Sequence, residues 1–355
     1  KALFGELLFF IIPLLILFFI TSGIASLPRN SGKLLGRTLA IAYSSTILAG
    51  IGAFFVASWV VPFLTTENRE VAQASANALA PFISMDIPPL FNVMTGLVLA
   101  FILGLGISAT QAPTLQKFSD EGRDIITKLL VKIIIPLLPF YIAGVFAEMA
   151  TAGTVFTTLK TFGVILLVAV ALHWVYIVTM FVLAGMKTAR SPIVLIKNML
   201  PAYFTALGTM SSAATIPVTL QSAKANKVND DIANFTIPLC ATVHLAGSTI
   251  TIVSCTVAVM VLHNALVIPS FFTMLPFILT LGFVMLAAPG VPGGAVMSAI
   301  GLLGSMLGFG ETALALMIAL YMAQDSFGTA CNITGDGAIA LFVDSAANTS
   351  ESKPT

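Results

Sequence analysis

Two aspartates share one face of an apolar C-terminal segment. Asp325, Thr329, Asn332 and Asp336 follow one another at i, i+4, i+7 and i+11. At about 100° per residue, eleven helical steps return to within roughly 20° of the start, and the carboxylates then lie about 16 Å apart. Because the segment contains no Lys or Arg, the acids must be protonated or find partners elsewhere. The pattern favours an ammonium group and a hard cation such as Na⁺, and the alternative is a structural polar network.

His244 lies in a second apolar segment, three residues before Gly247. Imidazole has an unperturbed pKa of about 6.5, so it can carry a proton or act as a ligand near neutral pH. The alternative is a neutral core imidazole that is hydrogen-bonded to its neighbours. His173, beside Trp174, and His263, at the end of an apolar stretch, are expected at the membrane interface.

The segments around these residues predict an all-α polytopic membrane protein. Of 355 residues, 58% are hydrophobic and 9% charged, against about 25% charged in soluble domains. Runs of about 20 apolar residues recur, which is the length of a spanning helix. Lys+Arg is 16 and Asp+Glu is 15, so no basic field exists to hold nucleic acid. We expect neither a soluble enzyme nor a nucleic-acid partner.

Clusters of basic residues predict the orientation of the chain. They are Arg29/Lys33/Arg37, Lys117/Arg123/Lys128/Lys132, Lys187/Arg190/Lys197 and Lys224/Lys227. The positive-inside rule places all of them in cytoplasmic loops. The predicted spans are residues 1–28, 38–64, 92–112, 129–150, 156–186, 232–262 and 311–343. The loop with Glu67, Arg69 and Glu70 is then outside, and the tail is cytoplasmic.

Two further apolar stretches predict re-entrant hairpins. Residues 198–223 lie between two cytoplasmic clusters, and their tip is expected between Ser211 and Pro217. A cytoplasmic amphipathic segment is the alternative for this stretch. Residues 269–309 are interrupted by the Pro- and Gly-rich run 288–294, which cannot stay helical. Broken helices of this kind form substrate and ion sites in transporters.

Four motifs in order resemble the dicarboxylate/amino acid:cation symporter family, the glutamate and neutral amino acid transporters. Residues 211–219 resemble its serine-rich first hairpin tip, 235–247 its seventh helix, 290–294 its second hairpin tip and 325–336 its eighth helix. The run Gln324-Asp325-Ser326 and Ala246 are similar to the bacterial serine/threonine:sodium symporter branch. The N-terminal half agrees more weakly, and the sequence is expected to begin in the family's second helix.

The resemblance implies a homotrimer in which a transport domain moves like an elevator against a trimerisation scaffold. Residues 1–75 would be the second and third spans, divided between the two parts. Scaffold spans would be 76–128, with an extracellular loop, and 129–155. The remaining expected units are the transport-domain span 156–190, the transport core 191–345 and the cytoplasmic tail 346–355.

One substrate site is implied by the same resemblance. Its residues are Ser211, Ser212, Val291, Gly293, Asp325, Gly328, Thr329 and Asn332. Asp325 would bind the substrate ammonium with help from Thr329. The serine-rich tip and Asn332 would hold the α-carboxylate, and the second hairpin would close over the substrate.

Two cation sites are implied as well. In the first, Asn332 and Asp336 act with the backbone carbonyls of Cys240 and His244. The second would use the carbonyl of Thr242 and those around Met285, Leu286 and Ala288. The coupling ion is expected to be Na⁺ or H⁺, without an organic cofactor.

Departures from the family pattern modify the expectation. Gly328 stands where members with acidic substrates have an arginine, so a second substrate carboxylate would be buried unpaired at a cost of several kcal/mol. The missing side chain is also expected to leave volume. His244-Leu245-Ala246-Gly247 replaces the usual asparagine, methionine, aspartate and glycine. We therefore expect fewer coupled cations and consider proton coupling through His244.

The predicted function is import of a small neutral amino acid, such as serine, threonine or alanine, by a symporter of the bacterial cytoplasmic membrane. The alternative is a proton-coupled transporter of small carboxylates. An intramembrane aspartyl protease is disfavoured because its carboxylates must share a proton, whereas Asp325 and Asp336 lie three turns apart. A passive channel needs a continuous polar pore, and a scaffold without transport would leave the two acids unexplained.

Overall fold

The computed structural model describes residues 2–26, 32–64, 85–151, 153, 155–263, 266–286 and 288–351. Within these ranges the regular structure is helical, without a strand. The predicted outer loop with Glu67, Arg69 and Glu70 lies outside the described residues, and so does Arg29.

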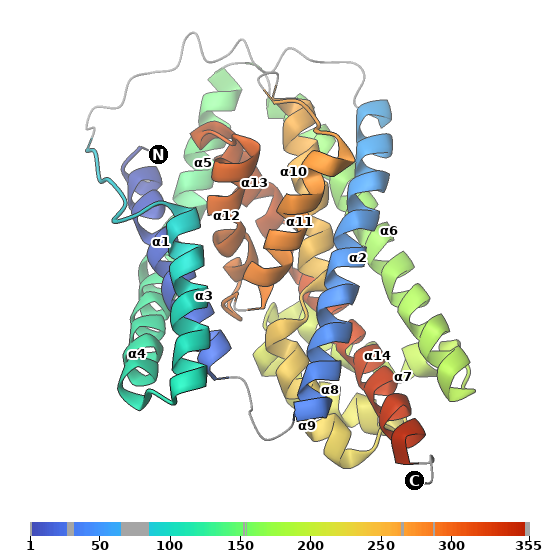
Figure 1. Cartoon of the computed structure of the whole chain (residues 1–355). Helices are drawn as coiled ribbons and strands as arrows, with labels where there is room; N and C mark the ends of the chain where they lie inside the picture. The colour runs from blue at the N-terminus through green and yellow to red at the C-terminus, as the bar shows by residue number, and fades with distance from the viewer. Residues whose placement is uncertain are drawn as a thin grey trace.

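Long helices build the first half of the chain (Figure 1). They are α1 (Ala2–Ala25), α2 (Gly32–Leu64), α3 (Val93–Thr110), α4 (Pro113–Leu129), a π-helical turn (Leu130–Ile134), α5 (Ile135–Thr151) and α6 (Val155–Thr188). Short helices build most of the second half. They are α7 (Pro192–Thr209), α8 (Ser212–Ala225), α9 (Asp230–Val243), α10 (Ala246–Leu262), α11 (Phe271–Met285), α12 (Gly294–Leu307), α13 (Glu311–Met322) and α14 (Asp325–Glu351).

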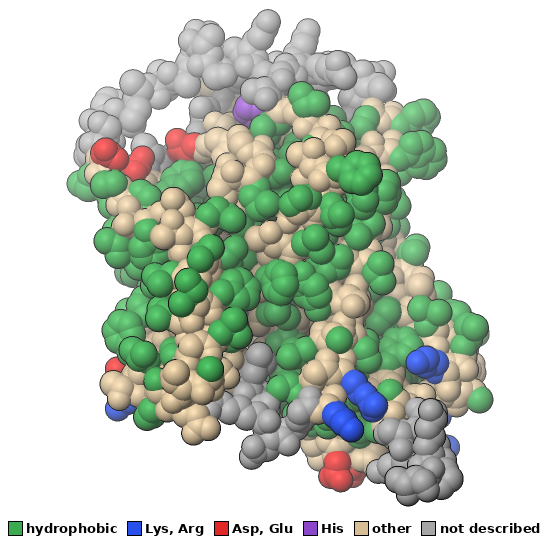
Figure 2. Space-filling view, viewed as in Figure 1, with side chains coloured by type: hydrophobic (Ala, Val, Ile, Leu, Met, Phe, Trp, Pro, Cys, Tyr) green, Lys and Arg blue, Asp and Glu red, His purple; other side chains and the backbone are tan. Residues whose placement is uncertain are grey.

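The apolar helices correspond to the predicted spans. In the described part of the chain, 6 helices are long and apolar enough to cross a membrane, and up to 7 if the bent pair α13 and α14 is one span. The exposed side chains agree, because Trp59 is 81% exposed and Phe272 82%, as expected of surfaces that face lipid. Figure 2 shows a broad hydrophobic band, with Lys and Arg side chains gathered towards the lower end.

The stretch predicted as a basic loop between the third and fourth spans is helical, and its cytoplasmic position stays a prediction. Residues from Pro113 onwards form α4, which runs through the π-helical turn into α5. Proline suits a first helical turn because its missing N–H has no partner there. The Ser22 hydroxyl donates to Asp120 Oδ1 at 2.6 Å and accepts from Arg123 Nη1 at 2.9 Å. These contacts hold the charged helix against α1.

Two helical hairpins reach the middle of the molecule from opposite ends (Figure 1). The pair α7 and α8 lies at the end where α14 finishes, and the pair α11 and α12 lies at the other end. The first turn is shorter than predicted, because helix resumes at Ser212 and includes Pro217. The second turn follows Met285 and ends before Gly294, where the Pro- and Gly-rich run predicted it. Re-entry of the hairpins into a bilayer stays a prediction.

Two spans are broken in the same region. The predicted span 232–262 divides into α9 and α10 on either side of His244, and 311–343 divides into α13 and α14 with a bend of 60°. The predicted polar face from Asp325 to Asp336 lies within α14 alone. This helix continues to Glu351, so residues 346–351 of the expected tail are helical.

Candidate functional site

The break between α9 and α10 lies directly against α14. His244 has φ −115° and ψ 97°, and Leu245 has φ −120° and ψ 46°, so neither continues the helix. A Cβ atom on Gly247 would meet the Gly328 carbonyl oxygen and would lie 2.5 Å from Cys331 Cβ. Glycine is therefore required for the start of α10 to approach α14 this closely.

Asn332 of α14 caps the buried start of α10. Its Oδ1 accepts from the backbone N–H of Gly247 at 2.7 Å and of Ser248 at 3.2 Å. Its Nδ2 donates to Ser248 Oγ at 2.9 Å. Helix N-termini carry N–H groups without intrahelical partners, and a buried side-chain oxygen satisfies them here. The Asn332 side chain thus joins the two broken helices, in addition to the binding roles expected from the sequence.

Asp336 pairs with His244 one turn further along α14. The carboxylate Oδ1 lies 2.8 Å from His244 Nδ1, and both side chains are fully buried. The second oxygen, Oδ2, is buried without a hydrogen-bond partner among the residues that the structure describes. A buried carboxylate oxygen without a donor is costly, and a hard cation is a chemically suitable partner.

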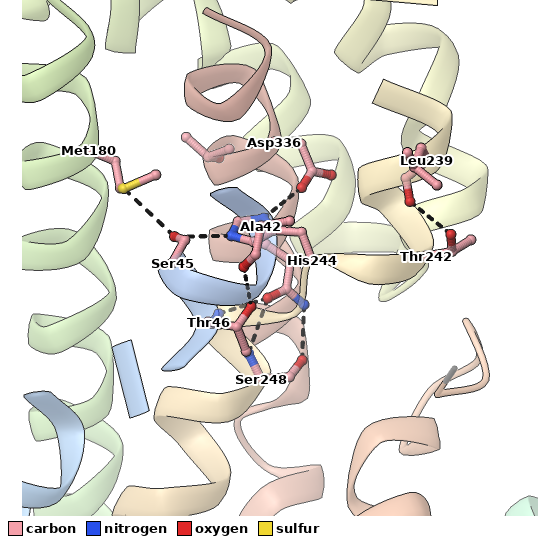
Figure 3. A network of polar contacts seen from close by, with 12 residues as sticks. Ala42, Ser45, Thr46, Met180, Leu239, Thr242, His244, Ser248 and Asp336 are labelled. Carbon is pink, nitrogen blue, oxygen red and sulfur yellow. Dashed lines mark hydrogen bonds and ion pairs between the residues drawn. The ribbon is translucent and has the colours of Figure 1, made fainter. Parts of the chain in front are cut away.

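Two residues that the sequence analysis missed hold the other side of the imidazole. Figure 3 shows the His244 ring between Ser45 of α2 and Asp336. His244 Nε2 lies 3.0 Å from the Tyr176 hydroxyl and 3.4 Å from Ser45 Oγ, and the two hydroxyls are 2.6 Å apart. The sequence signal that could have pointed to Tyr176 is its position three residues after His173 in the apolar helix α6, which places two polar rings on one helix face.

The prediction of an interfacial His173 is wrong. Its side chain is 1% exposed, and Nε2 lies 3.0 Å from the Gly247 carbonyl oxygen and 3.1 Å from Thr251 Oγ1. The neighbouring Trp174 suggested an interface, but His173 occupies the α6 face that packs against the start of α10. His263, by contrast, follows the last residue of α10, at the end of the span.

The tip of the second hairpin contacts the start of α14 at Asp325. Its Oδ2 accepts from the backbone N–H of Gly293 at 2.7 Å, and the side chain is buried. The Ser211 hydroxyl lies 3.4 Å from the Gly290 carbonyl oxygen, which connects one tip to the other. Ser211 also caps α8 by accepting from Ala214 N at 3.3 Å. Three predicted substrate residues, Ser211, Gly293 and Asp325, are thus linked through the second hairpin tip.

The other predicted substrate residues surround this point on the same elements. Ser212 and Thr329 are buried, and Val291 is half-buried. A Cβ atom on Gly328 would lie 3.3 Å from Thr251 Oγ1 and 3.5 Å from Ser248 Cα, so the first atom of a larger side chain would already contact α10. The sequence could not reveal this contact, and the volume expected beside Gly328 stays a prediction.

The second predicted cation set lies apart from the His244–Asp336 pair. Figure 3 shows Thr242 away from that pair, where its hydroxyl donates to the Leu239 carbonyl oxygen at 2.8 Å. Met285 is buried at the end of α11, and Leu286 and Ala288 are half-buried. The adjacent ends of α9 and α11 border an apolar cavity of ≈ 270 Å³. This set stays a prediction.

The comparisons with known proteins agree with the architecture. The chain is 28% identical over 250 residues to an excitatory amino acid transporter 1 of Ambystoma tigrinum. The matched region covers 69% of this chain and 45% of that protein. It is also 28% identical over 363 residues to a serine/threonine transporter SstT of Acinetobacter baumannii, strain AYE. That match covers 97% of this chain and 90% of that protein. The chain thus spans under half of the first relative and most of the second.

The family comparison covers nearly the whole chain. The pattern of the sodium:dicarboxylate symporter family matches residues 1–346. Its members are transporters and not enzymes, and the apolar spans make this chain an integral membrane protein. The chain belongs to the sodium:dicarboxylate symporter family.

Proposed function

We propose that the protein imports a small neutral amino acid of the serine, threonine or alanine kind, driven by a cation gradient across the bacterial cytoplasmic membrane. The contact of the second hairpin tip with Asp325, together with the Ser211–Gly290 contact between the two tips, supports this proposal most directly. This buried carboxylate lies in a region without Lys or Arg in the sequence, so a substrate ammonium supplies the compensating charge.

The substrate carboxylate is proposed to bind at the start of α8. Ser212 is the first residue of this helix, and Ser211 caps it. Free N–H groups and the helix dipole favour an anion at such an N-terminus. The carboxylate and the ammonium would then lie between Ser211 and Asp325, with Thr329 and Asn332 beside them. The Gly293 N–H is proposed to leave Asp325 when the ammonium takes its place, and Val291 would help the second hairpin to cover the substrate.

Selectivity for neutral substrates follows from the surroundings of Gly328. Glycine carries no guanidinium at this position, and α10 lies within contact distance of it. A second substrate carboxylate would lose water without gaining a cationic partner, at a cost of several kcal/mol. A hydroxyl or a methyl group carries no such penalty. Serine, threonine and alanine are therefore preferred to aspartate and glutamate.

The coupling cation is proposed to bind at Asp336 Oδ2. This buried oxygen, which has no hydrogen-bond partner in the described part of the chain, fits a small hard cation, and the carbonyl oxygens of Cys240, His244 and Asn332 would complete the oxygen ligands. Na⁺ is the ion that we propose here. The His244–Asp336 contact favours H⁺ as the second candidate, because an imidazole and a carboxylate can exchange a proton.

For transport, we propose an elevator movement within a homotrimer. Helices α6–α14 with α2 would carry the substrate, and α1 with α3–α5 would form the scaffold. The apolar cavity of ≈ 270 Å³ supports this division, since its lining combines Ile20 and Phe101 of the proposed scaffold with Val243 and Leu286 of the proposed transport domain. Loose apolar contact suits two parts that slide past each other.

Uptake into proteoliposomes tests the proposed function. Purified protein would be given serine, alanine, aspartate, lactate and pyruvate under a Na⁺ gradient alone and under a pH gradient alone. Serine or alanine uptake that needs Na⁺ supports the proposal, and Asp325→Asn should abolish it. Monocarboxylate uptake that needs only the pH gradient and survives Asp325→Asn would instead favour the proton-coupled carboxylate transporter.

A further inference from the structure

The imidazole of His244 is held from both of its nitrogen atoms. Asp336 of α14 contacts Nδ1 at 2.8 Å, and Tyr176 of α6 contacts Nε2 at 3.0 Å. Ser45 of α2 contacts the Tyr176 hydroxyl at 2.6 Å and lies 3.4 Å from Nε2. Four helices, α2, α6, α9 and α14, therefore determine how this one ring is placed. The proposed function gives no role to Tyr176 or Ser45.

Hydrogen-bond chemistry assigns a direction to this chain of contacts. An ionised carboxylate only accepts, so Nδ1 of His244 must donate to Asp336. In a neutral imidazole, Nε2 is then the acceptor and receives the Tyr176 hydroxyl proton. The Tyr176 oxygen in turn accepts from Ser45. Hydrogen-bond donation therefore runs from Ser45 to Tyr176, from Tyr176 to His244 and from His244 to Asp336.

Packing restricts the ring to this orientation. A Cβ atom on Gly335 would lie 2.9 Å from His244 Cε1 and 3.3 Å from the Tyr176 hydroxyl oxygen. The ring and the phenol therefore lie against bare backbone of α14, one residue before Asp336. Without the Tyr176 hydroxyl, Ser45 at 3.4 Å would be the remaining donor near Nε2, beyond the usual range for a hydroxyl hydrogen bond.

We propose that Tyr176 is a positioning residue for the candidate cation site, an inference that rests on the function proposed above. By donating to Nε2, Tyr176 keeps His244 in the tautomer that donates from Nδ1 to Asp336 Oδ1. The other oxygen, Oδ2, then stays open towards the cation. The opposite tautomer would turn a lone pair on Nδ1 towards Oδ1, and the carboxylate would have to move. Partners of this kind orient the groups that contact a metal ion and tune its affinity.

Conservative variants of purified protein test this role. Tyr176→Phe keeps the ring and removes the hydroxyl. Tyr43→Phe is the matched control, because its hydroxyl donates to the Leu279 carbonyl oxygen at 3.1 Å, away from His244. Ser45→Ala removes the donor to Tyr176 and provides a second variant should Tyr176→Phe fail to fold. The readouts are the rise in melting temperature with Na⁺ against choline, and the Na⁺ dependence of serine uptake.

For Tyr176→Phe we expect about a ten-fold higher Na⁺ concentration for half-maximal effect in both measurements. The uptake rate at saturating Na⁺ and the melting temperature in choline should remain close to wild type. Ser45→Ala should shift the Na⁺ dependence in the same direction by a smaller factor, and Tyr43→Phe should not shift it.

If folded Tyr176→Phe shows the wild-type Na⁺ dependence of melting temperature and of uptake, the inference is overturned and the proposed function still stands. If only Ser45→Ala folds, the same result in that variant has the same meaning. An equal shift in Tyr43→Phe would overturn it too, because the effect would not be specific to His244. If the wild-type protein shows no response to Na⁺ in either measurement, the ion assignment fails and the inference fails with it.

Discussion

His244 Nδ1 lies 2.8 Å from Asp336 Oδ1, although the residues are 92 positions apart in the chain. The contact joins the end of α9 to the middle of α14 with both side chains at 0% exposure. It uses one carboxylate oxygen and leaves the other free for a cation. A single contact therefore holds the end of α9 against α14 and also forms one side of the candidate ion site.

Asp336→Asn separates these two uses of the carboxylate. The asparagine Oδ1 can still accept from His244, while the amide that replaces Oδ2 repels a cation. We expect folded protein that has lost Na⁺-driven serine uptake and the Na⁺-induced rise in melting temperature. Uptake is measured in proteoliposomes, and the melting temperature is measured on purified protein in detergent. Full uptake with unchanged Na⁺ dependence would remove Asp336 from the cation site.

Asn332→Ala should lower stability as well as uptake. The change leaves the Gly247 and Ser248 N–H groups buried without their acceptor, at about 1–3 kcal/mol for each group. The melting temperature of purified protein checks this. Asn198→Ala is the comparison, because its Nδ2 contacts Asn226 Oδ1 at 2.8 Å at the base of the first hairpin, and its loss should cost about 1 kcal/mol. Equal effects of the two changes would contradict the capping role.

Gly247→Ala tests the close approach of α10 to α14. The added methyl group would overlap Cys331 Cβ and the Gly328 carbonyl oxygen, and overpacking of this kind costs about 1–3 kcal/mol. Gly106→Ala, in α3, is the matched control, since no atom lies within 4 Å of its added Cβ. We expect it to be neutral or to stabilise by up to about 1 kcal/mol, because alanine favours a helix. Thermal unfolding of both variants would show the contrast, and similar melting temperatures would refute it.

Gly328→Arg should not by itself produce full aspartate transport. Its Cβ would already press on Thr251 Oγ1 at 3.3 Å. We expect weak aspartate uptake and a lower melting temperature for the single variant. Combination with Thr251→Ala should increase aspartate uptake relative to serine, because it makes room for the guanidinium that pairs with the second carboxylate. If the folded double variant still excludes aspartate, the account of selectivity through Gly328 is incomplete.

Much of the fold could be predicted because membrane helices are encoded locally. Apolar length and the positions of charges marked the spans, and the Pro- and Gly-rich run ending at Gly294 marked the second hairpin tip. Local signals were weaker elsewhere. Charged residues after Pro113 suggested a loop but form an amphipathic helix, and Trp174 suggested an interface although His173 faces the core. The first difference arose because the charged residues lie on a helix that continues into α5, and the second because helix packing provides polar partners for His173.

The sequence by itself determined the class of protein, its family resemblance and the single helical face that carries Asp325 and Asp336. Periodicity and composition suffice for these, because they depend on neighbours within one helix. Only the tertiary structure decided which atoms remain available. It joined His244 to Asp336, placed Tyr176 behind the imidazole and brought α10 close to Gly328. These relationships depend on how separate helices pack, which no local pattern in the chain records.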